Sequence, residues 1–210
     1  MTLHLASQRL LLPSAQVSTL TTGSITLPSA RGAFVPATAF QSISSTLVGT
    51  AQATVSFTSI PQTFKHLEIR AYHWVTASGN NWDASGYWYL NNDTTTSNYT
   101  YHGVYSYNTN APTVNYSTNT NVILSRSGGN ENGTYFPAMT IIRILDYSST
   151  SKYKTALVQN GVENTGTGGY NFINSCEWAS TSAISQIDFY APSYTWQTGS
   201  TFSLYGILGE

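Results

Sequence analysis

The sequence predicts an all-β protein, an antiparallel β-sandwich preceded by an extended N-terminal arm. Two observations support this prediction. From residue 43 onward, short stretches of alternating apolar and polar residues are separated by clusters of Gly, Asn, Ser and Pro, a pattern that indicates roughly eight to ten short strands. Helical periodicity with capping residues is found nowhere in the chain. We therefore divide it into an arm, residues 1–42, and a β domain, residues 43–210.

Composition limits the classes of partner. Only 8% of the 210 residues are charged and the formal net charge is −1, so the chain lacks the basic surface that a phosphate backbone requires, and we predict no nucleic-acid partner. Many Tyr and Trp residues argue against disorder. No apolar run approaches the roughly 20 residues that span a bilayer, so we expect no membrane insertion. The single cysteine, Cys176, excludes an internal disulfide and is expected to be a buried strand residue.

The arm, residues 1–42, has no periodicity that would build a core, because Pro and Gly interrupt every fragment. It is nevertheless too apolar for a solvated linker. We interpret it as an assembly arm that lies on another surface, such as a second copy of the chain. The alternative is a flexible tail. The apolar residues expected to anchor the arm are Leu10, Leu11, Leu12, Ile25, Leu27, Phe34 and Phe40.

Residues 136–160 contain the clearest element, a β-hairpin. In its first strand both faces carry apolar side chains, with Met139 and Ile141 on one face and Ile142 and Ile144 on the other. This pattern predicts a central strand that is covered on both sides. The residues after the turn alternate again and are expected to fold back on the first strand.

The strand predicted at 66–75 has one apolar face and one polar face. Leu67 and His73 share the apolar face, so we expect His73 to be a hydrogen-bonded core or interface residue. Glu68 and Arg70 lie next to each other on the opposite face. They are predicted to form a surface ion pair that contributes little to stability.

The segment 76–135 is rich in Asn, Ser, Thr, Gly and Tyr, and it is predicted to form long polar loops between strands at one end of the sheets. Aromatic residues concentrate in this segment. One interpretation is an outward-facing recognition surface for a glycan or a partner, and the other is packing within the sheet, since aromatic residues favour strands. The residues assigned to the recognition surface are Trp82, Tyr87, Tyr99, Tyr107 and Tyr116.

A catalytic or metal site is not predicted. The four histidines are far apart and none stands in a metal-ligand spacing, and the chain has neither a G-x-S-x-G sequence nor a P-loop. A glycosidase needs two facing carboxylates. The acids of the aromatic segment, Asp83, Asp93 and Glu131, instead stand in turn sequences. We therefore expect a non-enzymatic protein without a cofactor and assign no metal-ligating residues, and a metal ion in the Asn- and Asp-rich loops stays an open alternative.

Four short motifs occur in a characteristic order. They are FTSIPQTFKHLEIR at 57–70, ILDY at 144–147 followed by KYK at 152–154, Trp178 followed by AISQI at 183–187, and GSTFSLYGI at 199–207. In this order the chain from residue 54 onward resembles a family of small structural virion proteins of tailed bacteriophages. The resemblance implies a jelly-roll-like domain in an oligomer on the head or tail of the particle, and it excludes residues 1–42.

Two functions follow as expectations. The first is a structural subunit of a tailed-phage virion, either a capsid decoration or a tail or fibre protein. It would assemble in the host cytoplasm, contact the major capsid or tail protein through its arm, and form a homo-oligomer, by analogy a trimer. The alternative is a lectin-like module that recognises a host glycan. Two experiments would distinguish these functions. Deleting the arm should abolish incorporation into the particle if the chain is a structural subunit, and replacing Trp82 and Tyr87 by Ala should abolish adsorption to the host if it is a lectin-like module.

Overall fold

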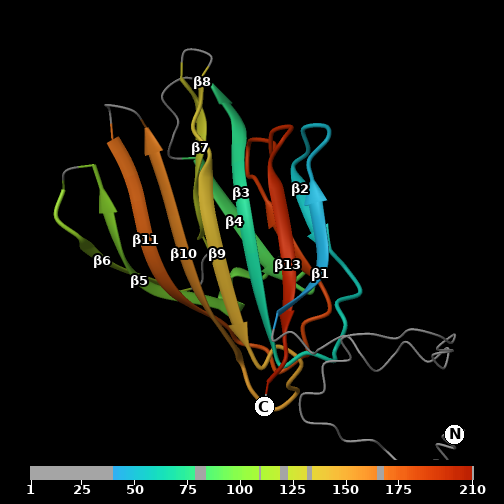
Figure 1. The fold of residues 1–210 in the computed structure, drawn as a ribbon. Coiled ribbons are helices and arrows are strands. Elements are labelled where there is room, and N and C mark those ends of the chain that lie inside the picture. The colour runs from blue at the N-terminus through green and yellow to red at the C-terminus, as the bar shows by residue number, and fades with distance from the viewer. Residues whose placement is uncertain are drawn as a thin grey trace, which may run out of the picture. The chain divides into compact units, whose positions relative to one another are not determined.

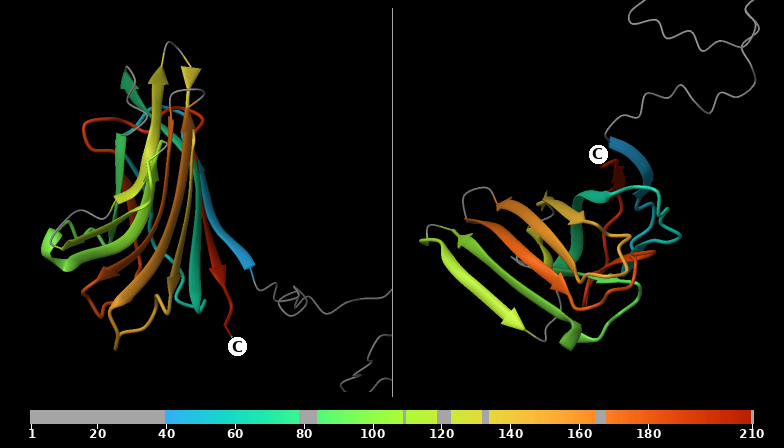
Figure 2. Two further views of the ribbon diagram at one scale, coloured as in Figure 1. Left: turned by 90° about the vertical axis from the view of Figure 1, so that its left-hand side faces the viewer. Right: turned by 90° about the horizontal axis from the view of Figure 1, so that it is seen from below.

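The fold is all-β, as predicted. The computed structural model describes residues 40–78, 84–108, 110–118, 123–131, 134–164 and 168–209, and within them the only helical element is a single 3₁₀ turn, η2 (Thr96–Asn98). The strands form two antiparallel sheets packed face to face, which Figure 1 shows with the larger sheet in front and Figure 2 shows from the side and from below. The prediction of an antiparallel β-sandwich is therefore confirmed.

The larger sheet contains eight strands in an all-antiparallel arrangement. From one edge to the other they are β1 (Phe40–Leu47), β13 (Thr201–Ile207), β3 (His66–Ser78), β9 (Ala138–Leu145), β10 (Lys154–Asn164), β11 (Gly168–Trp178), β5 (Tyr99–Tyr107) and β6 (Thr113–Thr118). Figure 1 places the β1 edge at the right and the β6 edge at the left.

The smaller sheet contains four antiparallel strands. In spatial order they are β2 (Thr54–Phe57), β12 (Ile187–Tyr190), β4 (Ala84–Leu90) and β7 (Ile123–Glu131). The short strand β8 (Thr134–Tyr135) pairs with the end of β7. A parallel contact between β7 and the end of β3, through the pair Trp74 and Gly128, connects the two sheets at one end.

The strand order is that of a jelly roll. If β1, β2, β3, β4, β7, β9, β12 and β13 are numbered one to eight, the two sheets have the orders 1-8-3-6 and 2-7-4-5, which is the double Greek key of jelly-roll proteins. Apart from the short strand β8, the remaining strands form two hairpin insertions, β5–β6 and β10–β11. Both hairpins extend the larger sheet beyond β9, because β10 pairs with β9 and β11 pairs with β5.

The hairpin predicted at 136–160 is formed by β9 and β10, but one part of that prediction is wrong. β9 is an interior strand between β3 and β10, and Ile142 and Ile144 are fully buried between the sheets. Its other face is open to solvent, where Met139 is 56% and Leu145 60% exposed. Apolar residues on both faces of β9 therefore did not mean that both faces are buried.

The core is formed by the alternate residues of strands from both sheets, and its centre is aromatic. Phe202 of β13 stacks on Phe189 of β12, with ring centroids 5.1 Å apart and an interplanar angle of 24°. The rings of Trp196 and His73 also contact the Phe202 ring, with centroid distances of 5.3 and 5.8 Å. Because β13 and β12 belong to different sheets, this cluster connects the two layers. Cys176, on β11, is buried as predicted, and burial raises the pKa of its thiol to about 12.

Glu68 and Arg70 form the predicted ion pair, but Glu68 is not a surface residue. Its side chain is buried in the otherwise open face of the larger sheet. The carboxylate accepts hydrogen bonds from Arg70 Nε (2.8 Å) and from Arg143 Nε of the neighbouring strand β9 (3.0 Å). The guanidinium of Arg70 also lies over the ring of Tyr205. Cross-strand pairing therefore gives Glu68 a second partner that the spacing within one strand did not reveal.

The domain begins earlier than predicted, and the segment 76–135 holds more strand than predicted. Phe40, which was assigned to the arm, begins β1 and pairs with Ile207. The other anchor residues of the arm lie outside the described residues. In the segment 76–135, strands were expected at 86–90, 99–105 and 121–125 between long polar loops. The segment contributes β4 to β8, of which β6 and β8 were not predicted.

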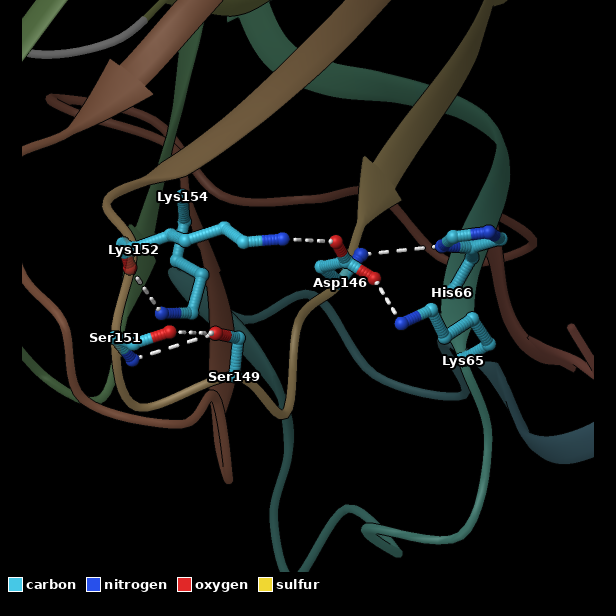
Figure 3. A network of polar contacts seen from close by, with 7 residues as sticks. All are labelled: Lys65, His66, Asp146, Ser149, Ser151, Lys152 and Lys154. Carbon is cyan, nitrogen blue, oxygen red and sulfur yellow. Dashed lines mark hydrogen bonds and ion pairs between the residues drawn. The ribbon is translucent and has the colours of Figure 1, made fainter.

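A network of polar contacts around Asp146 connects the ends of β3, β9 and β10 in the larger sheet (Figure 3). Asp146 follows β9 in a left-handed conformation, with φ of 48°. Its carboxylate pairs with the Nζ atoms of Lys65 (2.7 Å) and Lys152 (2.9 Å), and its N–H donates to His66 Nδ1 (3.1 Å). Lys154 donates to the carbonyl oxygen of Lys152 (2.9 Å), so all the lysines of the chain meet here.

We expect Asp146→Asn to lower stability at neutral pH and to flatten its acid dependence. Hydrogen bonds from Lys65 and Lys152 hold the pKa of Asp146 at about 2, below its ordinary value of 3.8. The carboxylate therefore stabilises the fold above pH 3.8, and this contribution is lost as the pH falls from there toward 2. Asn tolerates the left-handed backbone. Urea unfolding at pH 7, 4 and 2 measures the effect, and an unchanged slope between pH 4 and 2 would contradict it.

Candidate functional site

An open groove with a volume of about 350 Å³ lies on the outer face of the smaller sheet. The alternation of strand residues creates it. In β12, Ile187 and Phe189 are buried between the sheets, so Asp188 and Tyr190 lie on the outer face. A volume of this size is within the range of small-ligand pockets.

The strand register arranges the outer-face side chains in two rows across β2, β12 and β4. The rows are Ser56, Asp188 and Tyr89, and Thr54, Tyr190 and Tyr87. All of these except Tyr87 line the groove, together with Asn92, Thr94 and Gln186 from the adjoining loops. Each row thus ends in a tyrosine next to polar side chains.

The aromatic part of the groove is a pair of half-buried tyrosines. The ring centroids of Tyr89 and Tyr190 are 6.3 Å apart, with the planes tilted by 35°. Tyr89 also contacts the buried ring of Tyr99 edge to face at 6.4 Å, which limits its movement. Burial raises the pKa of Tyr89, and the neighbouring phenols of Tyr87 and Tyr190 raise it further. The Tyr89 hydroxyl therefore stays protonated at neutral pH and can donate a hydrogen bond.

The polar part of the groove is centred on Asp188, whose side chain is almost completely buried. Its Oδ1 accepts hydrogen bonds from Ser56 Oγ (2.5 Å) and Gln186 Nε2 (2.9 Å), and Oδ2 lies 3.1 Å from the same Nε2. These bonds come from neutral donors. Within the described residues, Asp188 has no ion pair.

The turn after β4 fixes Gln186. Asn91 and Asn92 both have left-handed backbones, with φ of 51° and 57°, a conformation that Asn adopts more readily than most residues. Asn91 Oδ1 accepts the N–H groups of Ser185 (2.8 Å) and Gln186 (3.1 Å). The amides of Asn92 and Gln186 exchange two hydrogen bonds, at 3.2 and 2.8 Å. The side chain of Gln186 is therefore held in place before any ligand arrives.

Asp93 anchors the same turn to the larger sheet. Its Oδ2 accepts hydrogen bonds from Trp178 Nε1 and Asn98 Nδ2, each at 2.7 Å, and its Oδ1 accepts the N–H of Thr95 at 3.0 Å. Burial raises the pKa of Asp93, but these hydrogen bonds outweigh burial and the net pKa is lowered. The sequence assigned Asp93 to a turn, and the structure places it in one.

The groove combines two aromatic faces with hydroxyl, amide and carboxylate groups. Aromatic faces pack on apolar C–H surfaces, while the polar groups accept and donate hydrogen bonds in fixed directions. Sugars present both kinds of surface on one molecule. Asp188 is the only carboxylate among the lining residues, whereas a glycosidase uses two. No cluster of three or more metal-ligating His, Cys, Asp or Glu side chains occurs within the described ranges.

The residues predicted as a recognition surface do not form one cluster. Tyr87 lies on the outer face of β4, beside the groove, and Trp82 lies outside the described residues. Tyr107, at the end of β5, packs against Tyr170 (6.1 Å between centroids). Tyr116 is 64% exposed on β6, where its ring contacts His102.

The prediction that Tyr99 belongs to an outward-facing recognition surface is wrong. Its side chain is 1% exposed, and its hydroxyl donates to the Asp93 carbonyl oxygen (2.8 Å) and accepts the N–H of Leu90 (3.1 Å). Burial raises the pKa of the Tyr99 phenol. It supports the groove from beneath through its contact with Tyr89.

Sequence reasoning missed most of the groove. Tyr89 stood in the aromatic segment but was not selected, and Asp188, Gln186 and Tyr190 lie about 100 residues further along the chain. One signal was present in β12: in the sequence IDFY a carboxylate and a tyrosine share the face opposite Ile187 and Phe189. An acid on a strand otherwise apolar or aromatic indicates a polar site on the outer face.

No protein family, curated protein or solved structure matched this chain. None of its helical segments within the described residues has the length and apolar character needed to cross a membrane.

Proposed function

We propose that this chain is a non-enzymatic carbohydrate-binding protein. The observation that carries the proposal is the groove in which Tyr89 and Tyr190 flank the preorganised pair of Asp188 and Gln186. Side chains that are already hydrogen-bonded in their positions lose little conformational entropy when a ligand binds. The fold is compatible with this function, because jelly rolls occur both in lectins and in viral capsid proteins.

The decisive variant is Tyr190→Ala. On a glycan array, the full-length chain should bind at least one glycan. Tyr190→Ala should weaken that binding about fivefold, because a stacked aromatic ring contributes on the order of 1 kcal/mol. Tyr190→Phe keeps the ring and retains most of the affinity. Tyr190 lies on the outer face, so the fold should survive, which circular dichroism and urea unfolding check.

Tyr116→Ala is the matched control, since Tyr116 is an exposed strand tyrosine far from the groove in the strand order. It should leave glycan binding unchanged. The proposal fails if the wild-type chain binds no glycan. The site is misassigned if Tyr116→Ala abolishes binding and Tyr190→Ala does not.

A second candidate function is that of a structural subunit in a tailed-phage virion. It is favoured by the four ordered motifs that resemble those virion proteins, and the broad outer face of the larger sheet is consistent with it. That face exposes apolar side chains on neighbouring strands: Tyr72, Val104, Val114, Met139, Leu157 and Ile173. Surfaces of this kind are typical of contacts between proteins. The two functions are compatible, because a glycan-binding subunit can belong to a particle.

The virion proposal predicts a permanent oligomer, for which a trimer is our expectation. Multi-angle light scattering of the full-length chain at several concentrations measures its mass. A mass that stays at a fixed multiple of 22.8 kDa supports an assembly subunit. A monomer at every concentration would count against self-association as part of its role.

A further inference from the structure

The charge of Asp188 is the least compensated feature of the groove. Its hydrogen-bond partners Ser56 and Gln186 are neutral. The remaining lining residues, Thr54, Tyr89, Asn92, Thr94 and Tyr190, are neutral as well. A nearly buried carboxylate without a cation is costly unless other donors complete its hydrogen bonding.

The carboxylate has acceptor capacity left. Two oxygens offer about four lone-pair positions, and the contacts from Ser56 and Gln186 use three of them. Gln186 cannot turn toward a ligand without breaking its paired bonds to Asn92. The open position on Asp188 is therefore available to a donor that enters the groove.

We propose that the sugar in this groove carries no negative charge and that one of its hydroxyl groups donates a hydrogen bond to Asp188. This inference rests on the proposed carbohydrate-binding function. Neutral hexoses supply such donors, and their ring faces fit beside Tyr89 and Tyr190. A sugar acid brings a second carboxylate near Asp188 in a partly desolvated site, where like charges repel more strongly than in water. The groove then selects neutral sugars and rejects acidic ones.

The test compares matched ligands that differ only in one group. Methyl glycosides of glucose, galactose and mannose, and of their uronic acids, are titrated against the full-length protein by saturation-transfer NMR. We expect at least one neutral glycoside to bind, and its uronic acid to bind about tenfold more weakly at low salt. In 1 M NaCl, where screening reaches about 3 Å, the difference should shrink.

The variant Asp188→Asn tests whether Asp188 causes the preference for neutral glycosides over uronic acids. Asn keeps the shape but removes the charge, so the uronic acid should approach the neutral sugar in affinity, to within about threefold. Glu163→Gln, at an exposed acid of β10 outside the groove, should keep the full discrimination. If Asp188→Asn fails to fold, the salt dependence of the wild-type protein still tests the proposal.

Three results would overturn the inference. They are equal or tighter binding of a uronic acid by the wild-type chain, discrimination that is insensitive to salt, and discrimination that a folded Asp188→Asn variant retains in full. Failure of the proposed function is a different result, in which neither the array nor the titrations detect any sugar.

Discussion

Phe202→Ala is expected to lower the free energy of unfolding by about 3–5 kcal/mol, the range for truncating a buried aromatic residue. The Phe202 side chain is fully buried, and its ring stacks on Phe189 and contacts Trp196 and His73. Because Phe202 belongs to the larger sheet and Phe189 to the smaller one, the truncation leaves a cavity between the layers. Neither sheet can close that cavity without moving as a whole, so little relaxation is expected.

Urea unfolding of the full-length chain measures the change, with two comparison variants. Phe202→Leu fills most of the volume and should cost about 1–2 kcal/mol. Tyr205→Ala lies on the same strand but on the outer face, where the ring contacts Phe40 and the Arg70 guanidinium, and should cost about 1 kcal/mol or less. If Phe202→Ala costs no more than Tyr205→Ala, the aromatic cluster does not hold the layers together.

Acidification from pH 7 to 4 is expected to remove about 3 kcal/mol of stability through His73 alone. His73 is completely buried, and burial lowers its pKa from 6.5 to about 3. The unfolded chain takes up a proton near pH 6.5, whereas the folded chain does so only near pH 3. Between these values the unfolded state binds more protons, so stability falls with decreasing pH by up to about 1.4 kcal/mol per unit. The loss is complete below pH 3.

His73→Phe tests the origin of this pH dependence. Phe keeps an aromatic ring against Trp196 and Phe202 but loses the 2.9 Å hydrogen bond between His73 Nε2 and Thr140 Oγ1. The variant should be less stable by about 1 kcal/mol at pH 7 and should lose about 3 kcal/mol less than the parent on going to pH 4. His102→Phe, at an exposed position, should keep the parental slope. A His73→Phe variant with the parental slope would show that another group is responsible.

Strand periodicity was the most dependable signal in this sequence. The alternation at 66–75 placed Leu67 and His73 on the buried face of β3, and the alternation after residue 136 located the β9–β10 hairpin. These predictions succeeded because the side chains of a strand alternate regardless of its partners. The same periodicity does not report whether the second face is covered, and for that reason Met139 and Leu145 were misjudged.

The candidate site was found only in part. Tyr87 was selected because aromatic residues cluster near it in the sequence. Asp188 and Tyr190 were not selected, because their proximity to Tyr89 arises from the pairing of β12 with β4, which are nearly 100 residues apart. Tyr99 was selected wrongly, since an aromatic residue in a polar segment can fill the core as readily as it can face a ligand.

Residue types and their spacing alone were enough to predict that the chain is all-β, sparsely charged and free of recognisable catalytic motifs. These properties depend only on local alternation and composition. The pairing of β12 between β2 and β4, the burial of Asp188 among neutral donors, and the stacking of Phe202 on Phe189 all required the folded chain. Each depends on contacts between residues far apart in sequence. Such contacts are set by strand order and register, which local patterns do not encode.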